Sequence, residues 1–180
     1  MAAVEERYGE ALLEIAVQEK REKQYLEEVK VLRNLFDENP ALLTFYTNPK
    51  ITQSEKEKVT EKCFKDGLSP EIAGLITVLI RNGRASSILK VLEWFTDAIK
   101  EKLNIGVVYV ESATEISDRK KKEIEKKLLE TTTFSSLEMN YDIKPEIIGG
   151  LRIRIKDRIV DNSIRTKLQN MSNELRQIRI

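Results

Sequence analysis

Side chains suited to catalysis are scarce in this sequence. Its 180 residues include no histidine and a single cysteine, Cys63. Histidine is the usual general acid or base near neutral pH and the commonest metal ligand. A cysteine nucleophile needs a base or a cation to form its thiolate, and no histidine is available for that role. We therefore expect Cys63 to be a small buried or half-buried residue of a helix, and the composition argues against an enzyme.

The glycines and carboxylates do not fit a known ligand site either. The glycines at 67, 74, 83, 106, 149 and 150 match neither the phosphate-binding loop nor the dinucleotide fingerprint. Carboxylate pairs such as Glu5-Glu6 and Glu27-Glu28 lie on predicted helices close to Lys and Arg, which is typical of solvated helix faces. We expect no catalytic residue, no metal site and no cofactor.

The charges nearly cancel, because 31 Lys and Arg residues face 30 Asp and Glu residues. A net charge of +1 supplies no field that would recruit nucleic acid. The basic run Arg119–Lys122 is followed by interleaved glutamates, and Arg152 and Arg154 alternate with apolar residues. No aromatic residue interleaves with these charges, as stacking on single strands would require. We expect solvated faces and no nucleic-acid partner, although a nucleic-acid-binding module in the second half stays an alternative.

The first hundred residues have apolar side chains at helical spacing, separated by clear breaks. Thr52 and Glu55 form a capping box, in which each side chain accepts a hydrogen bond from the other residue's backbone N–H. Ser69 as N-cap with Pro70 in the first turn predicts another helix start. These signals predict six helices, at about Val4–Ile15, Tyr25–Phe36, Ala41–Tyr46, Thr52–Gly67, Pro70–Asn82 and Ile88–Asn104.

The pattern changes at Ile105, where β-branched residues predict a strand. Further strands are expected at Leu137–Ile143 and Leu151–Lys156, with Ile159-Val160 as a hairpin extension. A charged helix is expected at Asp118–Thr131, and a last helix is striped by Ile164, Leu168, Met171, Leu175 and Ile178. The fold class is therefore mainly α with a smaller α+β part: a six-helix bundle over 1–104, then a small β-sheet domain with two helices over 105–180. No apolar run approaches the roughly 20 residues that span a bilayer.

Two helix faces stand out as candidate partner-binding surfaces. The first helix presents Tyr8, Ala11, Leu12 and Ile15, and the fifth presents Ile72, Leu75, Ile76 and Leu79. For any single residue, packing in the core is the more common role. The fifth helix is apolar around more than one stripe, however, and such a helix can serve a core and an external helix together. Spacing alone does not decide which of these residues face outward.

Several local motifs occur in a distinctive order along the chain. They are Arg7-Tyr8-Gly9-Glu10-Ala11-Leu12, Asn48-Pro49, Arg81-Asn82-Gly83-Arg84, Val110-Glu111-Ser112-Ala113, Gly149-Gly150 and Ile159-Val160-Asp161-Asn162-Ser163-Ile164. In this order they resemble the delta subunit of F-type ATP synthase, a relative of the mitochondrial oligomycin-sensitivity-conferral protein. The resemblance covers essentially the whole chain.

The resemblance implies a non-catalytic stator subunit at the cytoplasmic face of the cell inner membrane, a peripheral membrane protein held there by the complex. Residues 1–104 would bind the catalytic head, with a groove between the first and fifth helices receiving the N-terminal helix of an alpha subunit. Carried over, the groove consists of Tyr8, Ala11, Leu12, Ile15, Ile72, Leu75, Ile76 and Leu79. The domain 105–180 would face the stalk and engage the C-terminal region of the b subunits.

The second-domain motif of that family maps onto Gly149, Gly150, Asp161 and Ser163, which we interpret as turn and helix-start residues. Asp161 or Asn162 would accept hydrogen bonds from free N–H groups. Gly9 stands where another small residue, often Ala, is usual, and we expect it to weaken the first helix slightly. The main alternative function is a generic helical scaffolding or adaptor protein.

Overall fold

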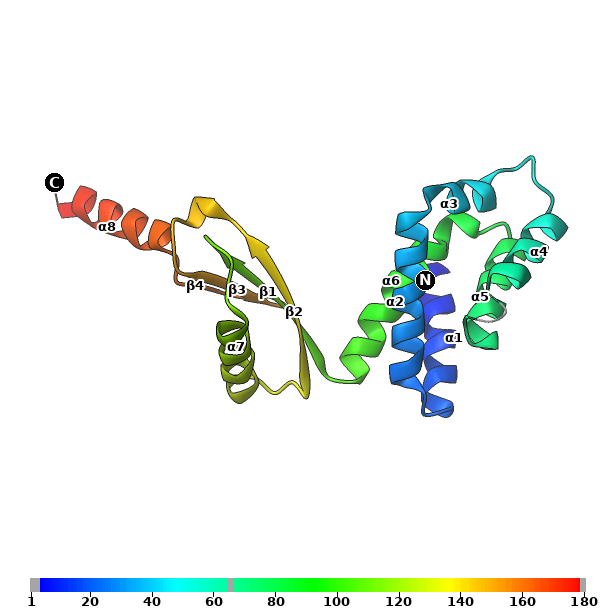
Figure 1. Ribbon diagram of the computed structural model, residues 1–180, viewed down its shortest axis with the longest axis horizontal. Coiled ribbons are helices and arrows are strands. Elements are labelled where there is room, and N and C mark those ends of the chain that lie inside the picture. Colours follow the sequence, from blue (N-terminus) through cyan, green and yellow to red (C-terminus); the bar gives the residue numbers. More distant parts are fainter. Residues whose placement is uncertain (1–3, 65–66, 179–180) are drawn as a thin grey trace. The chain divides into compact units, whose positions relative to one another are not determined.

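The chain divides into two compact units, Met1–Leu103 and Asn104–Ile180. The computed structural model describes residues 4–64 and 67–178, with side chains in the last helix described up to Arg176. Figure 1 shows helices in the first unit and a sheet with helices in the second. The expected fold class is confirmed.

The first unit contains the six predicted helices. They are α1 (Val4–Gln18), α2 (Glu22–Glu38), α3 (Pro40–Thr47), α4 (Gln53–Phe64), α5 (Pro70–Arg81) and α6 (Ile88–Lys102), with a short 3-10 turn η1 (Ala85–Ser87) before α6. Helix α6 packs against α1 and α2, and α4 packs against α5. The core between them is apolar, and Tyr25, Phe95 and Ile99 are fully buried in it.

The start of α4 has the predicted capping box. The backbone N–H of Thr52 donates to Glu55 Oε2 at 3.0 Å, and the backbone N–H of Glu55 donates to Thr52 Oγ at 3.4 Å. The start of α5 differs from the prediction, because Ser69 makes no side-chain cap. Its hydroxyl instead donates to Glu28 Oε1 at 2.9 Å, and its N–H donates to Glu28 Oε2 at 2.6 Å. A carboxylate from α2 thus holds the start of α5.

The Glu28 contact makes the first unit sensitive to acid. Burial alone would raise the pKa of the Glu28 carboxyl, but hydrogen bonds from Ser69 and Gln24 and the charge of Arg21 outweigh it, so the pKa is lowered. A lowered folded-state pKa contributes stability above the unfolded value of about 4.3. That stability is lost as the pH falls through the folded-state pKa.

Glu28→Gln is therefore expected to destabilise the first unit by about 1 kcal/mol at pH 7. The variant should also lose less stability than the wild type between about pH 5 and pH 3, since it has no carboxylate to protonate. Denaturant unfolding followed by fluorescence of the single tryptophan, Trp94, measures both effects. Parallel pH profiles for the two proteins would contradict this assignment.

Gly9 has a packing role that the sequence did not indicate. A Cβ at this buried position would overlap the Trp94 ring, whose Cζ3 lies at 3.0 Å from the ideal Cβ position. Gly9 therefore allows α1 to lie close to α6, and the expectation of a mere loss of helix propensity was incomplete. The contact joins residues far apart in the chain, so helix periodicity could not predict it.

Gly9→Ala is expected to destabilise the first unit by about 1–3 kcal/mol, because the added methyl group overpacks the α1–α6 contact. Gly74→Ala is the matched control: no atom lies within 4 Å of a Cβ there, and the position is exposed on α5. The control should stabilise the unit by about 0.5–1 kcal/mol. Equal effects of the two changes in Trp94-monitored unfolding would refute the proposed role of Gly9.

Cys63 is exposed, which corrects the expectation that it is buried or half-buried. The buried face of α4 consists of Lys56, Thr60 and Phe64, spaced by four residues. Cys63 precedes Phe64 by one position and is therefore turned about 100° away from that face.

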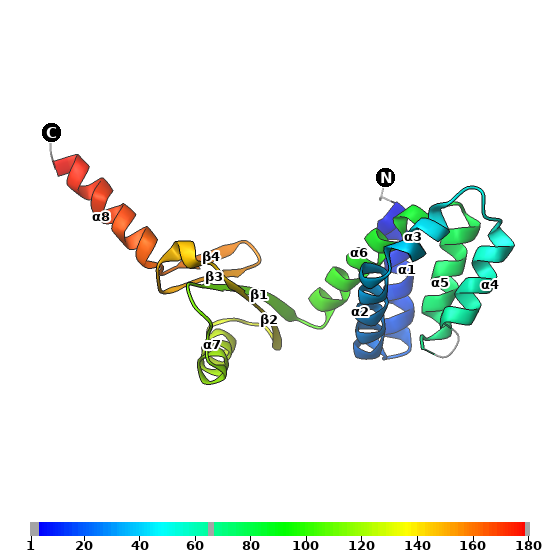
Figure 2. The same ribbon diagram turned by 45° about the horizontal axis from the view of Figure 1, so that its top comes forward.

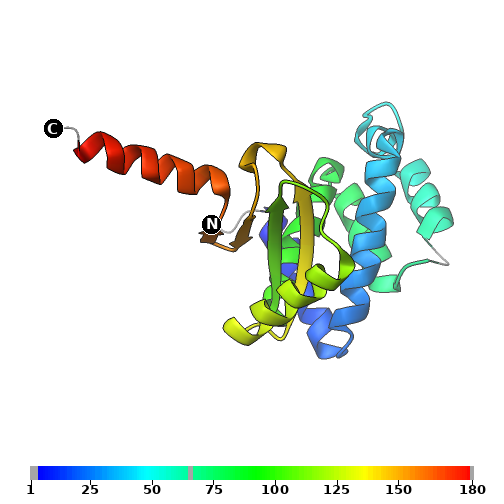
Figure 3. The same cartoon turned by 60° about the vertical axis from the view of Figure 1, so that its left-hand side comes forward.

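The second unit is a four-stranded sheet with two helices. Its elements are β1 (Ile105–Ser112), α7 (Asp118–Thr131), β2 (Ser136–Ile143), the 3-10 turn η2 (Pro145–Ile147), β3 (Leu151–Ile155), β4 (Arg158–Asp161) and α8 (Ile164–Ile178). The strand order is β2-β1-β3-β4, with β1 parallel to β2 and antiparallel to β3. Helix α7 joins the parallel pair and lies across one face of the sheet (Figures 2 and 3).

The central strand β1 carries the core of the second unit. Val108 and Val110 are fully buried on the face that α7 covers. The opposite face is exposed to solvent and carries Tyr109, Arg152 and Arg154. Helix α8 packs against η2 at its base and then extends away from the sheet (Figure 3). Among the described helices, none has the length and apolar character needed to cross a membrane.

Candidate functional site

The eight predicted groove residues fall into two groups in the structure. Four of them lie in the core of the first unit with at most 2% of their surface exposed, namely Leu12, Ile72, Ile76 and Leu79. These side chains hold α1 and α5 together. A partner could contact these four side chains only if the first unit unfolded locally. They can stabilise a binding surface from beneath, but they do not contact the partner themselves.

The other four residues are accessible. Ala11 and Ile15 are exposed, and Tyr8 and Leu75 are half-buried. Val78, which the sequence analysis did not select, is 42% exposed three residues after Leu75 on α5. We call Tyr8, Ala11, Ile15, Leu75 and Val78 the α1–α5 surface. The sequence indicated this surface through the wide apolar face of α5. Leu75 and Val78 form the outer edge of that face.

The Arg81–Arg84 motif contacts Tyr8. Asn82 Nδ2 donates to the Tyr8 hydroxyl oxygen at 2.9 Å, and Arg84 Nη1 donates to the same atom at 3.3 Å. The Arg84 guanidinium also lies 5.7 Å from the centroid of the Tyr8 ring. Gly83 has a φ of +67° and makes the turn between these two side chains. The motif therefore fixes the tyrosine beside the exposed edge of α5.

In the second unit, the two glycines lie beside the Asp161–Ser163 segment. Gly149 O accepts a hydrogen bond from the N–H of Ile164 at 2.9 Å. Gly150 has a φ of +82°, and a Cβ there would overlap the carbonyl oxygen of Asn162. The two segments are 11 to 14 residues apart in the chain, and their backbone contact sets where α8 begins.

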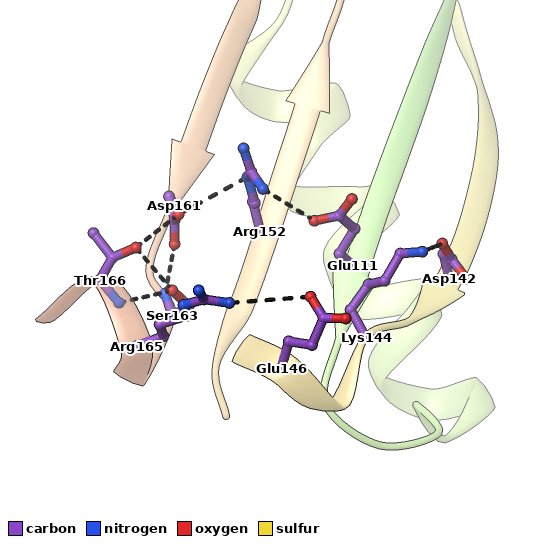
Figure 4. Close-up of polar contacts among 9 residues, drawn as sticks. All are labelled: Glu111, Asp142, Lys144, Glu146, Arg152, Asp161, Ser163, Arg165 and Thr166. Atoms are coloured by element: carbon purple, nitrogen blue, oxygen red, sulfur yellow. Dashed lines mark hydrogen bonds and ion pairs between the residues drawn. The ribbon is translucent and has the colours of Figure 1, made fainter. Parts of the chain in front are cut away.

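Asp161 and Ser163 satisfy the free N–H groups at the start of α8 (Figure 4). The N–H of Ser163 donates to Asp161 Oδ1 at 2.9 Å, and the N–H of Thr166 donates to Ser163 Oγ at 3.2 Å. The Thr166 hydroxyl donates to Asp161 Oδ2 at 2.9 Å. The hydrogen bond from the Ser163 N–H is the main reason why the pKa of Asp161 is lowered, and the Ser163 and Thr166 hydroxyls and Arg152 add to it.

Ion pairs extend this cap across the edge of the sheet (Figure 4). Arg152 lies between Glu111 and Asp161, at 3.5 and 3.8 Å. Arg165 of α8 lies 4.0 Å from Glu146 of η2. These partly exposed pairs order the segments around α8, although each contributes little to stability on its own. Over residues 4–64 and 67–178 no His, Cys, Asp or Glu cluster is arranged to hold a metal ion.

Two aromatic rings lie beside basic residues of β3 and its turn, which the linear sequence did not indicate. The Arg154 guanidinium is 4.7 Å from the Tyr109 ring centroid, and Lys156 Nζ is 5.8 Å from that of Phe134. Both rings come from other parts of the unit. Arg152, on the same strand as Arg154, is paired with the carboxylates of Glu111 and Asp161. The basic side chains of β3 therefore do not form a continuous positive surface of the kind that binds a nucleic-acid backbone.

Helix α8 exposes a row of large apolar side chains. Ile164, Leu168, Met171 and Leu175 are 44%, 54%, 60% and 68% exposed. The periodicity predicted this stripe, while its exposure follows from the direction in which the helix leaves the sheet. Ile178, predicted to continue the stripe, has a side chain outside the described residues.

Comparisons with known proteins fit this architecture. Residues 4–175 match the model of the family described as ATP synthase delta (OSCP) subunit. The chain belongs to the ATP synthase delta (OSCP) family. Members of this family are non-catalytic structural subunits of the F-type ATP synthase, the complex that couples proton transport to ATP synthesis.

Two delta subunits and one solved structure illustrate the relationship. The ATP synthase subunit delta of Lachnoclostridium phytofermentans is 40% identical over 98% of this chain and 97% of its own length. That of Halalkalibacterium halodurans is 31% identical over 96% and 94%. A chain of the mitochondrial ATP synthase hexamer of Toxoplasma gondii has the same fold, with a TM-score of 0.74 and 20% identity over 97% of this chain and 98% of that chain.

Proposed function

We propose that this delta-family chain links the catalytic head of the ATP synthase to its peripheral stalk, so that the head does not rotate with the rotor. In this proposal the first unit binds the N-terminal helix of an alpha subunit, and the second unit binds the C-terminal region of the b subunits. The observation that supports it best is that each unit exposes an apolar helical surface, the α1–α5 surface in one and the stripe of α8 in the other.

The α1–α5 surface suits an amphipathic helix. Aliphatic Ile15, Leu75 and Val78 are accessible along two helices packed against each other, and Tyr8 is held by hydrogen bonds at one end. Aromatic and aliphatic anchors of this kind supply most of the binding energy in helix-in-groove contacts. The buried Leu12, Ile72, Ile76 and Leu79 keep the two helices in place, so the surface is formed before the partner arrives.

In this role the chain is a peripheral membrane protein at the cytoplasmic face of the cell inner membrane, held there through the complex. No described helix is long and apolar enough to cross a membrane, which agrees with this proposal.

Membranes stripped of their own delta subunit test the function. Adding this chain with its cognate head should restore ATP synthesis driven by a proton gradient, and the ATPase rate of the free head should not change. Restored coupling without the chain, or an altered ATPase rate of the free head, would refute the structural role. If the chain were instead a scaffold for unrelated partners, adding it would not restore ATP synthesis.

A further inference from the structure

Helix α7 covers only part of the sheet face on which it lies. Val108 and Val110 of β1 are fully buried on this face, whereas their β3 neighbours Ile155 and Ile153 are only half-buried. Val160 of the outer strand β4, which is paired with Ile153, is 63% exposed. The half of this face that β3 and β4 form is therefore apolar and largely open to solvent.

This open half-face and the end of α7 border a recess of about 680 Å³. Ile153, Ile155 and Val160 line its sheet side, and Leu128 and Phe134 line its helix side. Sites for small molecules commonly have volumes of about 300–1,000 Å³ and a mostly apolar lining with a few polar groups. The size and the lining of the cavity fit that class of site, and we call it the β3–β4 recess.

The helix side of the recess is unfavourable for an anion. Two threonines there donate their hydroxyl hydrogens within the helix: Thr131 Oγ1 donates to Lys127 O at 2.9 Å, and Thr132 Oγ1 donates to Leu128 O at 2.7 Å. This end of α7 also carries the partial negative charge of a helix C-terminus. A negative group of a ligand would therefore lie on the other side of the recess, at the turn between β3 and β4.

That turn has a net positive charge, because Lys156, Asp157 and Arg158 all border the recess. Lys156 lies over the Phe134 ring, with Nζ 5.8 Å from the centroid. Arg158 is paired with Ile155 in the sheet register, which places its side chain on the recess face of β4. Within residues 4–64 and 67–178 the Arg158 guanidinium has no ion pair or hydrogen bond. Its donors are therefore available to a ligand.

We propose that the β3–β4 recess binds a small amphipathic anion, namely a single-chain carboxylate whose apolar tail lies along Ile153 and Val160 and whose head is bound by Arg158. A guanidinium can donate two parallel hydrogen bonds to one carboxylate, and burial of the tail against the strands supplies further affinity. The recess lies between a helix and a hairpin, so it suits one chain and not the flat surface of a bilayer. This site goes beyond the proposed function and does not depend on it.

Calorimetric titration of the full chain with decanoate, below the concentration at which decanoate forms micelles, tests the proposal. We expect saturable binding. Val160→Asp should weaken it at least about tenfold, because the new carboxylate lies beside both the tail and the head of the ligand. Ile159→Asp is the matched control, since Ile159 is 53% exposed on the opposite face of β4. It should leave the affinity unchanged, and circular dichroism verifies that both variants keep their fold.

Two changes at the turn test the role of charge. Arg158→Gln should weaken decanoate binding about five- to tenfold, because it removes the charge-assisted hydrogen bonds to the head. Asp157→Asn should strengthen binding about two- to threefold, since it removes a repulsive carboxylate from the same rim. Decanol has the same tail without the charge, so its weaker binding should respond to neither change. Equal effects on decanoate and decanol would overturn the assignment of an anionic ligand.

The remaining outcomes decide whether the recess is the site. Hydrogen exchange resolved by segment should slow in β4 and at the end of α7 when decanoate is present. No saturable binding by the wild-type chain would overturn the proposal. Binding that is lost in Leu168→Asp but kept in Val160→Asp would place the ligand on α8 and also overturn it. Binding to anionic vesicles with none to free decanoate would indicate a membrane surface, which contradicts the proposal as well.

Discussion

Replacing Ile15 or Leu75 by aspartate is expected to weaken binding of the alpha-subunit N-terminal helix at least about a hundredfold, which corresponds to about 2.7 kcal/mol. Ile15 is 36% exposed and Leu75 is half-buried, so either aspartate can remain solvated in the free unit. In the complex the same carboxylate would be buried against an apolar helix without a partner, which is costly. The loss should therefore appear in binding and not in folding.

Leu12→Asp is not a suitable variant for this test, although Leu12 belongs to the groove predicted from the family. Leu12 is only 2% exposed, and an aspartate there would put a charge into the core and unfold the unit. Loss of binding by this variant would therefore report on folding and not on the α1–α5 surface.

The matched control is Ser54→Asp, which adds the same charge to an exposed position of α4. It lies in the first turn of its helix, where a negative charge is favourable. Calorimetric titration with a synthetic alpha-subunit N-terminal peptide measures affinity, and Trp94 fluorescence with circular dichroism verifies the fold. Unchanged affinity of both Ile15→Asp and Leu75→Asp would contradict the proposal that the alpha-subunit helix binds the α1–α5 surface.

Gly150→Ala is expected to cost the second unit about 3 kcal/mol or more. Two effects add: the φ of +82° is unfavourable for alanine, and the new Cβ would overlap the Asn162 carbonyl oxygen and lie 3.1 Å from Ser163 Cα. All of these are backbone atoms, so relief requires the start of α8 to move. The variant should therefore loosen α8 before the rest of the sheet.

Gly83→Ala separates the two effects, because Gly83 has a φ of +67° but no atom within 4 Å of a Cβ. It should cost the first unit only about 1–2 kcal/mol, the cost of the backbone conformation alone. Amide hydrogen exchange resolved by segment measures both units, since Trp94 reports on the first only. Equal losses in the two variants would show that the contact between Gly150 and Asn162 is not a tight one.

The helices could be predicted from the sequence because their signals are local. Apolar spacing and breaks such as Asn48-Pro49 place all six helices of the first unit, and the Thr52–Glu55 capping box is confirmed by its hydrogen bonds. Contacts between distant residues could not be predicted in this way. The carboxylate of Glu28 at the start of α5 and the Trp94 ring against Gly9 depend on how helices pack, which periodicity does not contain.

The candidate surfaces were predictable only in part, for a related reason. Spacing shows that Leu12 and Ile15 share an apolar side of α1, but neighbouring helices decide that one is buried and the other exposed. The apolar stripe of α8 could be predicted from its spacing, whereas its exposure follows from the direction in which α8 leaves the sheet. The β3–β4 recess gave no sequence signal, because it forms where α7 leaves part of the sheet uncovered.

The most direct test of the central claim is whether one chain bridges the two partners. The soluble b segment is fixed to a surface, and retention of the cognate catalytic head is measured with and without this chain. We expect the head to be retained only when the chain is present, and we expect retention to be lost with either Leu75→Asp or Leu168→Asp. Retention of the head without the chain, or no retention in its presence, would contradict the proposed link.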